Sequence, residues 1–174
     1  MIEDRSWTFC GTPDYLAPEI VSNLGHNRAV DWWTLGILTY ELLHGEPPFA
    51  ADEQMETYRN IRAHRMHPMR SSTSGPARDL IRRLLSPSPS MRLGMLRGGA
   101  NDVRRHDFCA HIEPAQLDAR TLPAPYIPRL KSAKDTSNFD SYPADAEASA
   151  ARKYERHLDS KYDAVWDKEF GATV

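Results

Sequence analysis

The chain has 174 residues, of which 40% are hydrophobic and 26% charged, a composition that fits one globular domain, or two at most, and excludes a wholly disordered chain. With 22 Lys and Arg against 24 Asp and Glu, the formal net charge is −2, so there is no excess positive field to hold nucleic acid as the main partner. The sequence has two distant cysteines and no signal peptide, and no apolar run approaches the roughly 20 residues of a membrane span. These features predict a soluble protein of the cytoplasm or nucleus, without a membrane partner.

The strongest periodic segment runs from Ala29 to Leu43 and stops before Gly45, a typical helix end. Its apolar residues fall on every side of a helical wheel. The sequence therefore predicts a central helix that is surrounded by protein.

Shorter helices are predicted over Glu53–Ala63 and Ala77–Leu85, each with one apolar side. The polar segment 64–76 between them and the Ser-Pro-Ser-Pro-Ser run at 86–90 predict surface loops, because prolines disfavour a continuing helix. A further short helix is expected from Asn101 to Cys109.

Three prolines between Leu122 and Pro128 predict a semi-extended strap, after which charged and small residues alternate with spaced aromatics. We therefore expect two parts, a compact part over residues 1–128 and a tail over 129–174. Residues 146–168 of the tail are rich in helix formers and predict an amphipathic helix. Very little of the chain reads as strand, so the fold class is mainly α.

The most informative run is Gly11-Thr12-Pro13-Asp14-Tyr15-Leu16-Ala17-Pro18-Glu19, which contains the A-P-E that ends the activation segment of protein kinases. The run is followed by Val30-Asp31-Trp32-Trp33, Gly45-Glu46-Pro47-Pro48-Phe49, Arg92-Leu93-Gly94 and Asn138-Phe139-Asp140. Together these motifs resemble the second half of an AGC-group serine/threonine protein kinase of the cyclic-AMP-dependent type, over roughly residues 5 to 142. The resemblance implies a partial kinase large lobe from the activation segment onward, with an extended AGC-type C-terminal tail. In the family some neighbours of the helix at 29–43 come from upstream segments, so we also expect part of its surface to lack cover here and to form an aggregation-prone patch.

Phosphoryl transfer needs a Gly-rich loop, a lysine paired with glutamate, a catalytic aspartate with its asparagine, and a metal-holding aspartate. In kinases these motifs precede the A-P-E, and few residues precede it here. ATP and Mg²⁺ are the cofactors of the intact family, and we expect none, and no catalytic residue, for this chain alone. Asp107-Phe108-Cys109 follows the A-P-E and lacks the glycine of D-F-G, and His64 and His67 have no suitably spaced third ligand, so no metal site is predicted.

The resemblance also implies roles for residues of the activation segment. Thr8 matches the activation-loop phosphothreonine, and an exposed, unmodified threonine is the alternative. Thr12 matches a hydroxyl that supports catalysis by bonding to the catalytic aspartate and lysine. A pocket for the apolar residue after the phosphoacceptor corresponds to Phe9, Pro13 and Leu16.

Two carboxylates match groups that receive substrate arginines, Glu41 and Asp14, for which charge-assisted pairs are suited. For Glu41 the alternative is a helix residue paired to a neighbour. Asp31 matches a buried aspartate that anchors the catalytic loop, with a helix-start cap as the alternative. Glu19 and Arg92 match a buried structural ion pair.

Trp7 and Tyr58 match aromatics that contact the cyclic-AMP-binding regulatory subunit, and packing in the core is the alternative for both. In the tail, Phe139 and Tyr142 match aromatics that reach toward the nucleotide cleft.

The function that we expect is the C-terminal part of a kinase that phosphorylates Ser or Thr in basic motifs, with substrate-docking and scaffold elements but no catalysis of its own. The alternative is a non-catalytic decoy that binds the regulatory subunit or the substrate. A third hypothesis is that the chain is a separated part of a longer kinase sequence.

Overall fold

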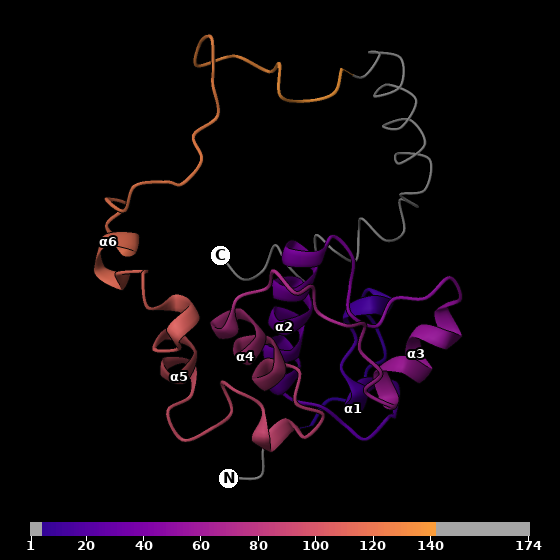
Figure 1. The fold of residues 1–174 in the computed structure, drawn as a ribbon. Helices are drawn as coiled ribbons and strands as arrows, with labels where there is room; N and C mark the ends of the chain where they lie inside the picture. Colours follow the sequence, from indigo (N-terminus) through magenta and orange to yellow (C-terminus); the bar gives the residue numbers. More distant parts are fainter. Residues whose placement is uncertain (1–4, 142–174) are drawn as a thin grey trace, which may run out of the picture. The chain divides into compact units, whose positions relative to one another are not determined.

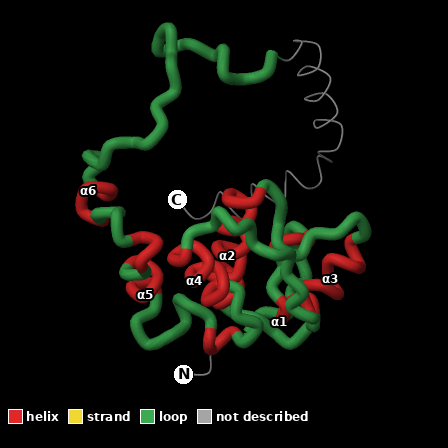
Figure 2. Tube along the Cα trace, in the orientation of Figure 1, coloured by secondary structure: helices red, strands yellow, loops and turns green. Residues whose placement is uncertain are grey.

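The computed structural model describes residues 5–141, and the chain divides into one unit up to Pro123 and another from Ala124. The described residues form helices and loops, with an antiparallel bridge between Ser6 and His26 in place of any longer strand (Figures 1 and 2). The α-helices are α1 (Pro18–Val21), α2 (Ala29–His44), α3 (Gln54–Arg62), α4 (Gly75–Leu84), α5 (Ala100–Arg104) and α6 (Pro114–Asp118). Short 3₁₀ turns form at η1 (Pro13–Tyr15), η2 (Pro89–Met91) and η3 (Asp107–Cys109).

Helix α2 is the centre of the first unit and matches the span predicted from the sequence to within one residue. It ends at Gly45, whose φ of 88° is left-handed and whose N–H donates to the Glu41 carbonyl at 2.7 Å. Helices α2 and α4 pack closely at Gly36, where an added Cβ would lie 2.8 Å from Leu85 Cδ2. The glycine therefore sets the distance between the two helices.

Two hydrophobic clusters form the core of this unit. The larger one surrounds α2 and consists of Ala17, Trp33, Ile37, Tyr40, Phe49, Ile61, Ile81 and Leu85. The smaller one joins α4 to the segment after it and consists of Leu80, Leu84, Leu93 and Val103. Helix α4 begins where the Ser74 hydroxyl accepts the Ala77 N–H at 3.3 Å, and its apolar side faces both clusters.

The expectation that protein surrounds α2 on every side is wrong for its C-terminal half, whereas the expectation that part of the helix lacks cover is confirmed. Leu38, Leu42 and Leu43 are 42%, 77% and 41% exposed, whereas Trp33, Ile37 and Tyr40 are buried. Helix α4 and the turns η1 and η2 pack against α2, and the described residues leave the leucine side open. This side is called the leucine face below.

Three further expectations need correction. The segment from Asn101 to Cys109 is not one helix, because it turns at Arg105 and His106 between α5 and η3. Asp31 does not cap α2: it lies in the first turn with an exposed side chain, and Asn27 Oδ1 accepts the Ala29 N–H at 3.0 Å instead. The family match implied that Asp31 is buried, but its side chain is exposed. Four short elements, η1, α1, η2 and α6, were not predicted; each has a proline at its start and is too short for a periodic signal.

The described part of the second unit, residues 124–141, is non-helical. Asp135 closes a turn in it by accepting the Lys131 N–H at 2.7 Å and the Ser137 N–H at 2.9 Å. These backbone bonds lower the pKa of the Asp135 carboxyl. Phe139 is exposed, whereas Tyr142 and the helix expected over 146–168 lie outside the described residues.

Candidate functional site

Two segments far apart in sequence meet where η1 touches α2. Pro13 starts η1, and the Tyr15 N–H closes the turn on the Thr12 carbonyl at 3.0 Å. This turn directs the Tyr15 ring toward the last turns of α2, where its hydroxyl donates a hydrogen bond to Glu41 Oε2. We call Asp14, Tyr15 and Glu41 the acidic site.

The electrostatics of the acidic site are visible in Tyr15. The hydrogen bond to Glu41 raises the pKa of Tyr15 to about 12, with further contributions from burial and from the charges of Glu41 and Asp14. The phenol therefore keeps its proton at neutral pH and holds the Glu41 carboxylate in place. A carboxylate accepts through two oxygens, so Glu41 retains capacity for a second donor. An arginine guanidinium, with its fork of N–H donors, has the chemistry to bind there.

Three aromatic side chains lie at the surface: Trp7 and Phe9 are exposed in the segment before η1, and Tyr58 is half-buried on α3 against the larger cluster. Phe9 meets Tyr58 edge to face, with ring centroids 6.0 Å apart. The Tyr58 hydroxyl accepts from Gln54 Nε2 at 2.9 Å. Trp7 is 61% exposed and rests on Gly25, where an added Cβ would lie 3.0 Å from its ring. We call Trp7, Phe9 and Tyr58 the aromatic surface.

The three residues expected to form one apolar pocket differ in exposure. Phe9 is 56% exposed and Pro13 is half-buried, whereas Leu16 is 4% exposed and lies in the interior. The Leu16 side chain approaches Gly11, where a Cβ would come within 3.2 Å of Leu16 Cδ2. Leu16 therefore packs behind the loop, and a ligand on this surface would meet Phe9 and Pro13.

Thr8 and Thr12, the two threonines before η1, are exposed. The Ser6 hydroxyl donates to Thr8 Oγ1 and accepts the Thr8 N–H, both at 3.4 Å. Thr12 contributes its carbonyl to η1. Neither hydroxyl is buried, so both are accessible to a partner or a modifying enzyme.

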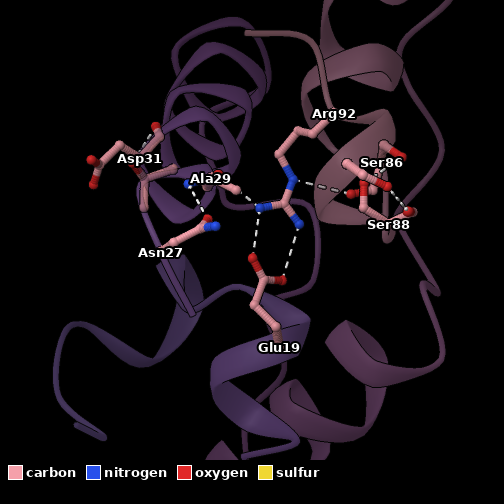
Figure 3. A network of polar contacts seen from close by, with 9 residues as sticks. Glu19, Asn27, Ala29, Asp31, Ser86, Ser88 and Arg92 are labelled. Atoms are coloured by element: carbon pink, nitrogen blue, oxygen red, sulfur yellow. Dashed lines mark hydrogen bonds and ion pairs between the residues drawn. The ribbon is translucent and has the colours of Figure 1, made fainter. Parts of the chain in front are cut away.

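The Glu19–Arg92 pair is the most completely bonded group among the described residues (Figure 3). Arg92 Nη1 lies 2.8 Å from Glu19 Oε1, and Nη2 lies 3.0 Å from Oε2, which makes the pair bidentate. Nη1 also donates to the Ala29 carbonyl at 2.7 Å and Nε to the Ser86 carbonyl at 3.1 Å. The guanidinium carbon lies 5.2 Å from the Trp33 ring centroid.

This network joins α1, the start of α2 and the loop after α4 around one buried charge. Both side chains are almost fully buried, and the carbonyls and the indole ring satisfy the guanidinium beyond its carboxylate partner. Sequence reasoning paired the two charged residues through the family resemblance. It missed Ala29 and Ser86 because backbone carbonyls leave no mark in a sequence.

Sequence reasoning also missed a contact between a histidine and an aspartate near η3. His106 is buried, its Nδ1 accepts the Phe108 N–H at 3.2 Å, and its Nε2 lies 3.0 Å from Asp79 Oδ2. The His106 bond, aided by Arg83, lowers the pKa of Asp79. The D-F-C segment is therefore a capped 3₁₀ turn whose Phe108 packs on the smaller cluster.

His64 and His67, the pair considered as metal ligands in the sequence, contact different partners. His64 Nε2 lies 2.7 Å from the Leu85 carbonyl, and His67 Nδ1 lies 3.7 Å from Glu46 Oε1. Residues 5–141 hold no group of three or more His, Cys, Asp or Glu side chains that could bind a metal ion. Within the same residues, the longest helices are too short or too polar to cross a bilayer.

The chain is similar in sequence to a known protein family and to several known proteins. The sequence pattern of the family described as "Protein kinase domain" matches residues 2–109. The chain is 43% identical over 168 residues to human cGMP-dependent protein kinase 2. The aligned residues make up 95% of this chain and 21% of that protein. The chain is 44% identical over 140 residues to the mouse cAMP-dependent protein kinase catalytic subunit PRKX, or 80% of this chain and 39% of the relative. The cAMP-dependent protein kinase catalytic subunit of Dictyostelium discoideum is 45% identical over 142 residues, 81% of this chain and 22% of its own length.

These curated relatives are all longer than the chain. The chain spans between 21% and 39% of their length.

Proposed function

The chain belongs to the protein kinase domain family, as part of an AGC-group serine/threonine kinase, and from this premise we propose that it supplies substrate-docking and scaffold elements without catalytic groups of its own. The reaction of the intact kinase would be transfer of the ATP γ-phosphoryl group to Ser or Thr in basic motifs. The relatives are named as cAMP- and cGMP-dependent kinases. For this chain we propose a location in the cytoplasm or nucleus, as its composition led us to expect.

The observation that carries the proposal is the acidic site. Tyr15 fixes the Glu41 carboxylate on the surface of α2, and Asp14 adds a second negative charge beside it. Arginine is recognised by carboxylates in charge-assisted, often bidentate pairs. A basic substrate segment would bind here, with the apolar residue after its acceptor near Phe9 and Pro13.

Mg²⁺ in phosphoryl-transfer sites is held by one or two carboxylates and by the phosphates of the nucleotide. No described residue matches the Gly-rich loop, the paired lysine, the catalytic aspartate or the metal-holding aspartate that the reaction needs. We therefore assign no step of phosphoryl transfer to this chain. Thr12, which matches the hydroxyl that supports catalysis in the family, would serve that role only beside catalytic groups from elsewhere.

A titration tests the docking function directly. A fluorescent peptide with two arginines before a serine and an isoleucine after it should bind the 174-residue chain, and the same peptide with glutamines for both arginines should bind about tenfold more weakly. The Glu41→Gln variant should bind the arginine peptide more weakly than the wild-type chain does, and its affinity for the glutamine peptide should be unchanged. Equal binding of the two peptides would contradict the proposal.

The catalytic half of the proposal has its own assay. Radiolabelled ATP, Mg²⁺ and the arginine peptide, incubated with the purified chain, should give no phosphate transfer above the protein-free blank. Transfer that follows the chain through purification would show catalytic groups that we do not assign.

The aromatic surface favours a second candidate function, a decoy for a cyclic-AMP-binding regulatory subunit. Trp7 and Phe9 are more than half exposed, and exposed aromatics are enriched among residues that dominate protein–protein affinity. A labelled regulatory subunit should bind the chain and lose affinity on Trp7→Ala. No measurable binding would leave substrate docking as the function.

A further inference from the structure

The loop between α4 and η2 carries a repeated dipeptide that neither the acidic site nor the ion pair explains. Ser86-Pro87 and Ser88-Pro89 follow each other directly, and Ser90 comes next without a proline. We propose that Ser88 is a phosphorylation site for a proline-directed protein kinase, an enzyme that selects the proline after the acceptor.

The backbone of Ser88 has the conformation that such an enzyme needs. A residue before proline is restricted to extended backbone, and Ser88 has φ −81° and ψ 114°. The acceptor itself lies outside a helix, because η2 begins at Pro89. An enzyme that binds Ser88 and Pro89 in extended form would open the single turn of η2 and find Ser88 already extended. Pre-organisation of this kind lowers the entropy cost of binding.

The Ser88 side chain faces solvent. Pro87 and Pro89 both line a hollow of about 410 Å³ beside Arg62, and successive side chains of an extended stretch point to opposite sides. Ser88, between the two prolines, therefore points away from the hollow, in agreement with its exposure. Its hydroxyl contacts another exposed hydroxyl, Ser90 Oγ, at 3.2 Å.

Ser86 is the weaker acceptor of the two. It is half-buried, its hydroxyl donates to the Ser88 carbonyl at 3.3 Å, and its own carbonyl accepts from Arg92 Nε at 3.1 Å. Bringing Ser86 into an enzyme would break the contact with the buried arginine. None of the bonds drawn in Figure 3 joins Ser88 to Arg92, so modification of the Ser88 hydroxyl does not itself require the Ser86–Arg92 contact to break.

The chemistry is an ordinary phosphoryl transfer supplied by the modifying kinase with ATP and Mg²⁺. A bond forms between Ser88 Oγ and the γ-phosphorus, the bond from that phosphorus to the bridging oxygen of ADP breaks, and the hydroxyl proton passes to the base of the modifying kinase. The product carries about −1.5 to −2 charges at neutral pH. Since the phosphate projects from the exposed side of the loop, the fold is retained.

The test uses the complete chain, a purified proline-directed kinase and radiolabelled ATP, with the site located by fragmentation mass spectrometry. Ser88→Ala should lose most of the incorporated phosphate, whereas Ser90→Ala, the matched control in the same loop, should keep it. Pro89→Ala, which retains the Ser88 hydroxyl, should lower the rate about tenfold or more, because a pocket shaped for proline loses its occupant.

Every outcome decides the proposal. Thr12 also precedes a proline, so Thr12→Ala is included, and phosphate confined to Thr12 or Ser86 would overturn the assignment. Wild-type incorporation in Ser88→Ala would overturn it as well. The thermal unfolding midpoint of each variant is measured as well. A midpoint equal to that of the wild-type chain shows that a variant which loses phosphate is still folded.

Discussion

Gly94 lies directly against the indole of Trp32: an added Cβ would be 2.3 Å from Trp32 Cδ2, far inside van der Waals contact. Gly94 is buried and has a φ of 92°, a left-handed conformation that residues with a Cβ adopt at a cost. The loop after Arg92 can therefore close over the start of α2 only with glycine at this position.

Gly94→Ala should lower the free energy of unfolding by more than about 2 kcal/mol, because overpacking adds to left-handed strain. Urea unfolding followed by tryptophan fluorescence measures the loss. The matched control is Gly45→Ala, where φ is 88° but nothing lies within 4 Å of the added Cβ, so only the strain of about 1 kcal/mol remains. Equal losses in the two variants would contradict the contact with Trp32.

Glu19→Gln should destabilise the fold by about 3–5 kcal/mol, because it leaves the buried Arg92 charge without its counter-charge. The control is Glu56→Gln, which removes an exposed pair with Arg59 at 2.8 Å on α3 and should cost less than about 0.5 kcal/mol. Chemical denaturation of both variants at neutral pH makes the comparison. A loss below about 1 kcal/mol for Glu19→Gln would mean that water reaches the pair.

The Tyr15–Glu41 hydrogen bond should respond to alkali. Its folded-state pKa of about 12 exceeds the ordinary value of 10.0, so the bond contributes its full stability below pH 10 and loses it as the pH rises toward 12. Ultraviolet difference titration of the chain against Tyr15→Phe isolates this phenol. Glu41→Gln should move the midpoint down toward 10, and a midpoint that stays unchanged in that variant would show that Glu41 is not the cause.

The leucine face should make the isolated chain associate, since contiguous exposed apolar side chains promote self-association. Leu42→Lys, at the most exposed of the three leucines, should reduce light scattering at a given concentration without lowering stability. The control is Met91→Lys, which replaces an exposed side chain (66%) in η2. Equal effects of the two lysines would point to net charge as the cause.

Sequence reasoning succeeded where a pattern repeats over many residues. The span of α2 follows from its apolar density and from Gly45, and α4 follows from Leu80, Leu84 and their neighbours. It failed at short elements such as α1 and η1, whose turns are closed by single backbone bonds and a proline. An uncovered part of α2 was expected from the resemblance, but Leu38, Leu42 and Leu43 could not be named as that part, because a helical wheel shows which residues are apolar but not what covers them.

The acidic site shows the same limit at the level of chemistry. Glu41 and Asp14 could be named from the resemblance, but nothing in the sequence says that Tyr15 reaches across 26 positions to hold Glu41. His106 and Asp79, 27 positions apart, meet in the same way. Such pairs depend on how the helices cross, which local sequence does not encode.

The Arg92 network has a consequence for a chain that has been cut. Arg65 is exposed in the connection between α3 and α4, a place where trypsin can cleave. Glu19 and Ala29 would then belong to one piece and Arg92 to the other, yet the buried bonds and the packing of α2 against α4 would still join them. The two pieces should travel together through gel filtration and separate only in denaturant.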